Sequence, residues 1–340
     1  MKRKTTLMEL AEECGVSIAT ISRFINGTGP VKAATRELIT AKMRELHYPI
    51  PEAYPVKNYW PKEKLIMINI PSLSNTFYNE ILRGARNAAS RLGYFLLVNV
   101  EHLNASNKHN FFELLRNVNP AGIIILNALP DDYFEELCSG KYTQFVQCCE
   151  YTEHQEQISY VSIDDYHATR NIMSYIFSTG HKRVAILSGP ERYKYARHRM
   201  KGFRDALFEA GLSLNKDWVI QLPEIEFDLA LSSVNKMLST PDRPDAIFCT
   251  SDIYAAAAIR GAVTAGLKVP HDVIVTGFDN IDISRTTSPS ITTMSQPKYQ
   301  LGFLACELLT DKIRNPHAAA QQILLDTELI IRESTGLPEA

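Results

Sequence analysis

Long apolar runs are absent from this sequence of 340 residues. A membrane-spanning helix needs roughly 18 or more consecutive apolar residues. The N-terminus, MKRKTTLMELAEE, has acidic residues where an export signal would have its apolar stretch. We therefore expect a cytoplasmic protein with no membrane anchor and no membrane partner.

The short motifs of common catalytic and cofactor sites are also missing. The chain contains no G-x-x-x-x-G-K-[ST], no G-x-S-x-G and no H-E-x-x-H, and the run 27–30 lacks the third glycine of a dinucleotide loop. The nine histidines are scattered, without the spacing of metal ligands. We expect no metal, no other cofactor and no enzymatic activity.

None of the six cysteines forms a C-x-x-C pair. In a long chain this pattern is typical of reduced, mostly packed thiols. Cys148 and Cys149 are adjacent, but they end an apolar run that begins at Phe145. This position favours a packed strand over a redox pair.

Charge is unevenly distributed along the chain. Residues 1–60 contain nine Lys and Arg against six Glu, whereas the remainder contains 27 basic and 32 acidic residues. A small basic segment on an acidic body is typical of a protein that contacts nucleic acid at one end. Chance segregation of surface charge is the alternative, so the residues of this segment must decide.

Three short helices are predicted within the basic segment. Thr6 and Glu9 fit a capping box at the start of the first helix, and Gly15 follows its end. Ser17 is a natural N-cap for a second helix that extends to about Ile25, and a third helix is expected over 33–47. The side chains expected inside are Leu7, Leu10, Ala11, Cys14, Ile21, Ile25, Leu38, Ile39, Met43 and Leu46.

Two short helices joined by a tight turn, with a third as support, describe a helix-turn-helix. On the outer face of the second helix, Ala19, Ser22, Arg23 and Asn26 follow helical spacing. Small side chains permit close approach to a DNA groove, Arg23 suits a guanine edge, and Thr20 and Ser22 suit phosphate oxygens. An ordinary solvated helix face has the same spacing, which therefore does not settle the question.

The rest of the chain alternates short apolar runs with amphipathic helices. This alternation predicts an α/β fold with parallel sheets and right-handed crossovers. Strands are expected at 65–70, 94–98, 122–126, 144–149, 184–187, 246–249 and 273–276, and helices near 78–92, 105–117, 165–179, 200–211, 228–239, 254–265 and 298–313.

The run from Thr6 to Gly27 resembles the N-terminal signature of the lactose/galactose repressor (LacI/GalR) family, in which Gly-Val-Ser and Ala-Thr-hydrophobic-Ser-Arg precede Asn-Gly. The resemblance implies that Ile18, Ala19 and Arg23 face bases and that Arg36 contacts the DNA backbone. The full set of expected DNA-binding residues is Thr6, Ser17, Ile18, Ala19, Thr20, Ser22, Arg23, Asn26 and Arg36. Val31-Lys32 replaces the usual Ser cap, so the start of the third helix should fray.

The linker departs from the family pattern. The family has a short hinge helix whose leucine inserts into the minor groove. Here Tyr54, Pro55 and Lys57 occupy the matching Ala, Arg and Leu positions, and Pro55 opposes helix formation. We expect an extended, stiff tether over 49–62.

For the core, the resemblance implies two α/β lobes like those of periplasmic sugar-binding proteins. The expected domains are a DNA-binding head (1–48), the linker (49–62) and an effector-binding core (63–340). Lobe one is placed at about 63–162 and 292–322, and lobe two at about 163–291 and 323–340. Loops at the ends of both sheets then face a ligand cleft.

The resemblance and the chemistry together suggest residues for this cleft. Arg199 lies in an Arg-x-x-Gly-Phe motif whose arginine grips the effector, and Asp279 follows a strand. An arginine and a carboxylate suit vicinal hydroxyls, and aromatic rings suit the apolar face of a sugar. The candidate effector-binding residues are Phe77, Tyr78, Gln147, Arg199, Phe227, Ser251 and Asp279.

Each candidate has a structural alternative. Arg199 could be a solvated helix charge, Asp279 a turn cap, and Phe227 ordinary packing. Asp164 and Asp165 could suggest a metal pair, but capping of the next helix is favoured. Lys298 would suit a phosphorylated sugar, although a solvated lysine is the simpler interpretation.

We expect a sequence-specific transcription regulator, a repressor of carbohydrate-metabolism genes. It would bind a near-palindromic DNA operator as a homodimer and respond to a small sugar or sugar-phosphate effector. One alternative keeps DNA binding but assigns a purine or a protein as co-effector. Another is a sugar-binding protein without DNA function.

Overall fold

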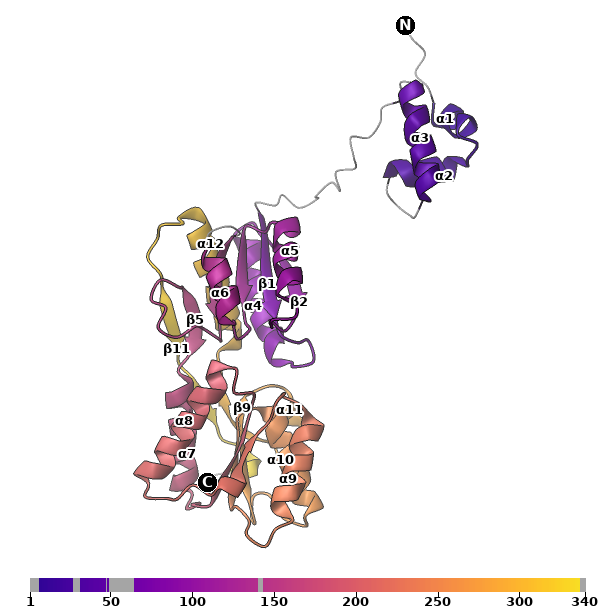
Figure 1. The fold of residues 1–340 in the computed structure, drawn as a ribbon. Helices are drawn as coiled ribbons and strands as arrows, with labels where there is room; N and C mark the ends of the chain where they lie inside the picture. The colour runs from indigo at the N-terminus through magenta and orange to yellow at the C-terminus, as the bar shows by residue number, and fades with distance from the viewer. Residues whose placement is uncertain (1–5, 27–30, 47, 49–63, 140–142, 337–340) are drawn as a thin grey trace. The chain divides into compact units, whose positions relative to one another are not determined.

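The computed structural model describes residues 6–26, 31–46, 48, 64–139 and 143–336 (Figure 1). The chain divides into two compact units, residues 1–61 and 62–340, which we call the head and the core. The tether expected at 49–62, with Tyr54, Pro55 and Lys57, lies outside the described residues.

The head contains the three expected helices, α1 (Leu7–Glu13), α2 (Ile18–Asn26) and α3 (Ala33–Glu45). The capping box is confirmed: the Thr6 amide donates to Glu9 Oε2 at 2.8 Å, and the Glu9 amide donates to Thr6 Oγ1 at 3.3 Å. Gly15 takes the left-handed conformation, with φ of 61°. Ser17 Oγ accepts from the Thr20 amide at 3.1 Å and so caps α2.

The head has a small apolar core to which all three helices contribute. Leu10, Ile21, Ile39 and Met43 are fully buried in it. Leu38 was wrongly expected inside, since it is 45% exposed. Ile39 and Met43 lie one turn apart on the inner face of α3, and the rotation of about 100° per residue turns Leu38 outward. At the start of α3, the N-cap Lys32 provides no side-chain hydrogen bond, consistent with the missing serine.

The core contains two six-stranded sheets. The first has the order β11-β5-β4-β3-β1-β2 and is parallel throughout; the second has the order β12-β10-β9-β8-β6-β7, with β12 antiparallel to β10. The strands of the first sheet are β1 (Leu65–Ile70), β2 (Phe95–Val100), β3 (Gly122–Ile125), β4 (Gln144–Cys148), β5 (Tyr160–Ile163) and β11 (Gln322–Leu325). Those of the second are β6 (Val184–Ser188), β7 (Val219–Gln221), β8 (Ala246–Cys249), β9 (Ile274–Asp279), β10 (Thr292–Ser295) and β12 (Glu328–Ile330).

Helices cover both faces of each sheet. Successive strand residues point to opposite faces, so a continuous apolar strand has side chains to bury on both. In the first sheet Ile66 packs with α4 and α12, whereas Met67 packs with α5 and α6. Figure 1 shows α7 and α8 on one side of the second sheet and α9 and α10 on the other. The core helices are α4 (Phe77–Arg91), α5 (Lys108–Val118), α6 (Asp131–Cys138), α7 (Asp165–Ser178), α8 (Lys194–Glu209), α9 (Phe227–Leu238), α10 (Asp252–Thr264), α11 (Ile283–Thr286) and α12 (Lys298–Arg314).

The chain passes three times between the lobes that carry these sheets. The first crossing follows β5 at Asp164, as expected. The second lies between β10 and α12 and the third between β11 and β12, both a few residues later than expected. Residues 292–295 belong to lobe two because β10 pairs with β9, and residues 323–325 belong to lobe one because β11 pairs with β5.

Among the described residues, no helix combines the length and the apolar character needed to cross a membrane. All six cysteines are free thiols: Cys14, Cys148, Cys249 and Cys306 are buried, and Cys138 is exposed. Cys148 ends β4 inside the core, so the prediction of a packed strand there is confirmed.

Helices α4 and α12 approach closely in lobe one, and glycine makes this possible. A Cβ added at Gly302 would lie 1.9 Å from the Ile81 carbonyl oxygen, and one at Gly84 would lie 2.1 Å from the Tyr299 carbonyl oxygen. Neither backbone oxygen can move without separating the two helices. The glycines therefore set the distance between α4, which begins at the cleft, and α12.

We predict that Gly302→Ala lowers the free energy of unfolding of the core by about 1–3 kcal/mol through overpacking. The sign is diagnostic, because alanine in a helix is otherwise about 1 kcal/mol better than glycine. Urea unfolding followed by fluorescence measures the change. Gln300→Ala, at an exposed position of the same helix, is the control and should have little effect. A stabilised Gly302→Ala variant would contradict the close packing.

Candidate functional site

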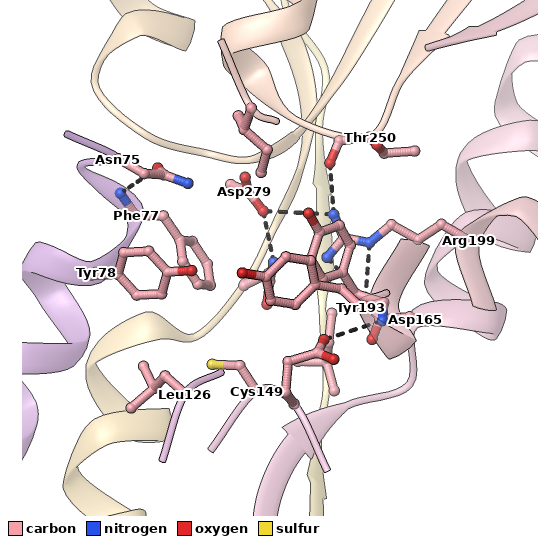
Figure 2. Close-up of a pocket in the computed structure, with 15 residues that line it drawn as sticks. Asn75, Phe77, Tyr78, Leu126, Cys149, Asp165, Tyr193, Arg199, Thr250 and Asp279 are labelled. Carbon is pink, nitrogen blue, oxygen red and sulfur yellow. Dashed lines mark hydrogen bonds and ion pairs between the residues drawn. The ribbon is translucent and has the colours of Figure 1, made fainter. Parts of the chain in front are cut away.

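A cavity lies between the two lobes, at the carboxyl ends of strands from both sheets (Figure 2). Lobe one contributes the start of α4 and the residues after β3 and β4, and lobe two contributes α8 and the ends of β8 and β9. The lining residues are Asn75, Phe77, Tyr78, Leu126, Cys149, Glu150, Ile163, Asp165, Tyr193, Tyr195, Arg199, Ile225, Thr250, Asp279 and Gln296.

The cavity is narrow in this arrangement of the lobes. It leaves about 40 Å³ of free space, far below the roughly 300–1,000 Å³ of a typical ligand pocket. Two aromatic pairs occupy much of the space. The rings of Phe77 and Tyr78 meet edge to face with centroids 5.3 Å apart, and those of Tyr193 and Tyr195 stack with centroids 5.4 Å apart. A ring-sized ligand therefore requires the lobes or these side chains to move apart.

Arg199 reaches from α8 into the centre of the site (Figure 2). Its Nε donates to Asp165 Oδ1 at 2.9 Å, and its Nη1 donates to the Thr250 carbonyl oxygen at 2.7 Å. Nη1 is also 3.8 Å from Asp279 Oδ1. The guanidinium lies over the Phe278 ring, 3.5 Å from its centroid. Arg199 is thus held by several protein groups and is buried.

Asp165 is the centre of a buried charge cluster, which also includes Lys194 and Arg199. Lys194 Nζ lies 2.8 Å from Asp165 Oδ2, and both side chains are almost inaccessible to solvent. Burial alone would raise the pKa of Asp165, but the positive charges of Lys194 and Arg199 lower it below its ordinary value. The neighbouring Asp164 accepts from the His167 amide at 2.9 Å, so its predicted role as the cap of α7 is confirmed.

Glu150 makes a hydrogen-bonded contact between the two lobes. Its carboxylate, which follows β4 in lobe one, accepts hydrogen bonds from the amides of Lys194 at 2.6 Å and Tyr195 at 3.1 Å. These amides begin α8 in lobe two, where the N-cap residue Tyr193 makes no side-chain cap. Burial raises the pKa of Glu150 to about 7, against the opposing charge of Lys194.

Asp279 ends β9 with a left-handed φ of 106° and presents its carboxylate to the cavity. Burial raises its pKa to about 6, while Arg199 and Lys298 oppose the shift. Behind it, Asp252 accepts from the Ile281 amide at 2.8 Å and from Thr293 Oγ1 at 2.6 Å. Burial, together with the charge of Asp279, raises the pKa of Asp252 to about 8.

The structure brings together four of the seven candidate effector residues, namely Phe77, Tyr78, Arg199 and Asp279. The other three lie outside the cavity lining. Gln147 is buried in β4, where its side chain pairs with Thr152; Ser251 caps α10 by accepting from the Ile253 amide; and Phe227 begins α9 at the surface. All three were predicted from their residue type and their place near a strand or helix end. In the structure, local hydrogen bonds hold the side chains of Gln147 and Ser251 away from the cavity, and Phe227 is 37% exposed at the start of α9.

Sequence reasoning missed several residues of the site. Tyr193 and Tyr195 precede the recognised arginine on α8, and Glu150 follows an apolar strand as Asp279 does. That strand-end position was a usable signal for Glu150. Lys194 gave none, because its role depends on pairing with Asp165, 29 residues earlier in the chain.

The head presents a separate surface. On α2, Ile18 (47% exposed), Ala19 and Arg23 face solvent, and Arg23 Nε donates to the Ala19 carbonyl oxygen at 3.3 Å. Arg36 on α3 is also exposed. The remaining DNA candidates have defined local roles: Thr6 caps α1, and Ser17 and Thr20 share a hydroxyl hydrogen bond at 2.9 Å, whereas Ser22 is half-buried. The side chain of Asn26 lies outside the described residues.

In the part of the chain that the structure describes, no group of three or more His, Cys, Asp or Glu residues is arranged to hold a metal ion.

Two protein families match the chain. Residues 6–51 match the family described as bacterial regulatory proteins, lacI family, and residues 173–335 match a periplasmic binding protein-like domain. The HTH-type transcriptional repressor CytR of Escherichia coli (strain K12) is 32% identical over 334 residues, which cover 97% of this chain and 96% of that protein. The HTH-type transcriptional repressor PurR of Photobacterium profundum is 29% identical over 339 residues, which cover 97% of this chain and 98% of that protein.

A solved structure is also similar over nearly the whole chain. The transcriptional regulator CelR in complex with cellobiose matches with a TM-score of 0.73 and 27% identity, covering 97% of this chain and 100% of that one.

We predict that the core becomes less stable as pH rises from about 5.5 to 8. Folded Glu150 and Asp252 keep protons that the unfolded chain has already released, because their pKa values of about 7 and 8 exceed the ordinary values of 4.5 and 3.8. The free energy of unfolding should fall by at least about 2 kcal/mol over this range. Urea unfolding at several pH values measures the slope. Asp252→Asn should reduce it, whereas Glu156→Gln at an exposed position should not; a flat profile would contradict the assignment.

Proposed function

Because the chain belongs to the lacI family of bacterial regulatory proteins and is a DNA-binding transcription regulator, we propose that it is an effector-controlled repressor of carbohydrate-metabolism genes. DNA binding is assigned to residues 1–48 and effector binding to the core. The observation that carries this assignment is the solvent-facing surface of α2, with Ile18, Ala19 and Arg23 together. Such a regulator works in the cytoplasm on chromosomal DNA, and we assign it no enzymatic activity.

The exposed face of α2 suits the major groove. Ala19 permits close approach, Arg23 can donate two hydrogen bonds to a guanine edge, and Ile18 offers an apolar contact to a thymine methyl group. We assign phosphate contacts to the exposed Arg36 and to the hydroxyl of Thr20. One head offers few base contacts, so we propose a homodimer that reads a near-palindromic operator.

The edge of the first sheet supports the proposed dimer. Strand β2 ends that sheet, and its side chains Phe95, Val98 and Val100 are exposed. An apolar edge strand is normally covered, and a second copy of the chain would cover it.

For the effector, we propose a small sugar bound in the cavity between the lobes. Phe77 and Tyr78 provide aromatic surfaces for the C–H face of a pyranose, and the carboxylate of Asp279 can accept from its hydroxyls. CelR, solved with cellobiose, supports this ligand class. A phosphorylated sugar is disfavoured, because Lys298 is held by the carbonyl oxygens of Asp279 and Asn280.

Control by the effector follows from the narrow cavity. A ligand that fits only a more open arrangement stabilises that arrangement in proportion to its preference for it. In a dimer, a change between the lobes alters the geometry available to the two heads.

We predict that Arg23→Ala lowers the preference for the operator over random DNA by about 10- to 100-fold, the loss expected for one bidentate base contact. Fluorescence anisotropy with an operator selected from genomic fragments measures both affinities. Arg44→Ala, which removes the same charge from the exposed surface of α3, is the matched control and should weaken both DNAs about equally. Unchanged discrimination in Arg23→Ala would refute the assignment of α2.

For the effector site, Tyr78→Ala should weaken sugar binding about 3- to 10-fold by removing an aromatic wall. Calorimetry with a panel of mono- and disaccharides first identifies the ligand and then compares the variants. Tyr94→Ala, in the same lobe but outside the cavity lining, should bind as the parent does. Binding of purines or nucleosides in place of sugars would instead support the alternative effector class.

A further inference from the structure

The charges that line the cavity are not balanced. Three carboxylates, those of Glu150, Asp165 and Asp279, face it with one guanidinium, that of Arg199. Arg199 and the neighbouring Lys194 both form their closest ion pairs with Asp165. The carboxylates of Glu150 and Asp279 therefore lie farther from these two cations than Asp165 does.

Asp279 has an oxygen available for a ligand. The side chain is only 5% exposed. Its Oδ1 accepts from Gln296 Nε2 at 2.7 Å and lies 3.8 Å from Arg199 Nη1, while Oδ2 has no hydrogen-bond partner among the described residues. The ammonium of Lys298 contacts the backbone carbonyl oxygens of Asp279 and Asn280 and does not line the cavity.

Glu150, unlike Asp279, has no ion-pair partner within 4 Å among the described residues. It is 4% exposed, and both of its hydrogen-bond donors are neutral backbone amides. The ammonium of Lys194 is directed instead to Asp165 Oδ2 and, at 3.3 Å, to Ser162 Oγ. The amides at the start of α8 offset part of the cost of burying this carboxylate, and a bound cation would offset the remainder.

The rest of the lining also suits a cation. Tyr78 from lobe one and Tyr193 and Tyr195 from lobe two present rings to the same cavity, and aromatic faces attract positively charged nitrogen. Arg192 and Arg199 already lie 5.0 and 4.8 Å from the ring centroids of Tyr193 and Tyr195. The hydroxyl of Tyr195 is buried without a hydrogen-bond partner in the described structure. A ligand with polar groups could satisfy it.

We propose that the effector is a sugar that carries a positively charged amino group, bound between the carboxylates of Glu150 and Asp279 and the tyrosine rings. The proposal rests on the proposed effector function of the cavity and specifies its ligand. The ammonium supplies the missing counter-charge, the sugar ring packs on the aromatic side chains, and the hydroxyls pair with Tyr195 and Gln296. An anionic sugar would meet these two carboxylates, and the one cation of the described lining, Arg199, is already held by Asp165 and Thr250.

The test is calorimetry on the full chain at pH 7.5 with three matched sets of sugars. These are the 2-amino sugars glucosamine, galactosamine and mannosamine, their N-acetyl forms, and the parent hexoses with glucose 6-phosphate. At least one amino sugar should bind about 10-fold or more tightly than its N-acetyl form and its parent hexose.

Two variants locate the charge. Glu150→Gln and Asp279→Asn keep the shape of the side chains and should each reduce the preference for the amino sugar to less than about 3-fold. Glu153→Gln is the matched control: this glutamate lies three residues from Glu150, pairs with Arg197 and His198, and does not line the cavity. The preference should survive in Glu153→Gln. Circular dichroism confirms that each variant is folded.

A pH series gives a second reading that does not require variants. Glu150 faces Lys194 and Asp165, and Asp279 faces Arg199, Lys298, Asp165 and Asp252. Because the pKa values of Glu150 and Asp279 are about 7 and 6, both carboxylates gain charge between pH 5.5 and 7.5. Affinity for the amino sugar should rise several-fold over this range, while affinity for an N-acetyl sugar should not.

The outcomes separate the two proposals. Equal binding of amino, N-acetyl and parent sugars, or tightest binding of glucose 6-phosphate, overturns the charged amino group and leaves the sugar effector standing. Binding of no sugar in these sets overturns the amino-sugar proposal, and binding of none in the wider panel of mono- and disaccharides overturns the sugar effector as well. A preference for the amino sugar that persists in Glu150→Gln and Asp279→Asn alike overturns the assigned position of the charge.

Discussion

The contact of Asp165 with Lys194 and Arg199 holds the site together. Asp165 begins α7 directly after the first crossing between the lobes, and both cations project from α8. All three side chains are buried, so removing one leaves an unpaired charge at a cost of about 3–5 kcal/mol. The same contact sets the position of the first turn of α8, and with it Tyr193, Tyr195 and the amides that Glu150 caps.

The two lobes contact each other through hydrogen bonds in which a charged side chain of lobe one pairs with backbone groups of lobe two. Glu150 of lobe one accepts from the start of α8 in lobe two. In return, Lys298 of lobe one donates to carbonyl oxygens at the end of β9. Both contacts link the lobes beside a cavity that leaves only about 40 Å³ of free space. If the lobes move apart to admit a ligand, these contacts weaken, and under our proposal the ligand's interactions with Glu150 and Asp279 would replace them.

The sequence was a good guide where one local signal decided the outcome. Apolar runs predicted seven strands, and six of these are buried, because a strand covered on both faces needs no polar alternation. The seventh, β2, is the exposed edge strand. Strands β5, β7, β10, β11 and β12 escaped prediction, since each contains polar residues and at most three consecutive apolar ones within its bounds. The start of α8 at Lys194 was also missed, because Glu150 supplies its cap from 44 residues away in the chain.

In the site, too, a local sequence signal predicted some residues but could not predict their partners in the folded chain. Arg199 and Asp279 were identified from a motif and a strand end, but the partner of Arg199 and the open oxygen of Asp279 depend on the folded arrangement. Gln147 and Ser251 had suitable chemistry and the right neighbourhood, yet each is occupied by a hydrogen bond to a residue five or fewer positions away.

A raised pKa alone does not mark a ligand group in this protein, as Asp252 shows. Its pKa is the highest of the three raised carboxyl values, but both of its oxygens accept hydrogen bonds, from Ile281 and Thr293, and it does not line the cavity. Asp252 therefore has a structural role, supporting the left-handed turn at Asp279 from behind. Asp279 differs because its Oδ2 has no hydrogen-bond partner among the described residues and because it lines the cavity. The cost of burying Asp252 is offset by its two hydrogen bonds, whereas the cost of burying Asp279 is offset in part by Gln296 and Arg199 and, under our proposal, further by the ligand.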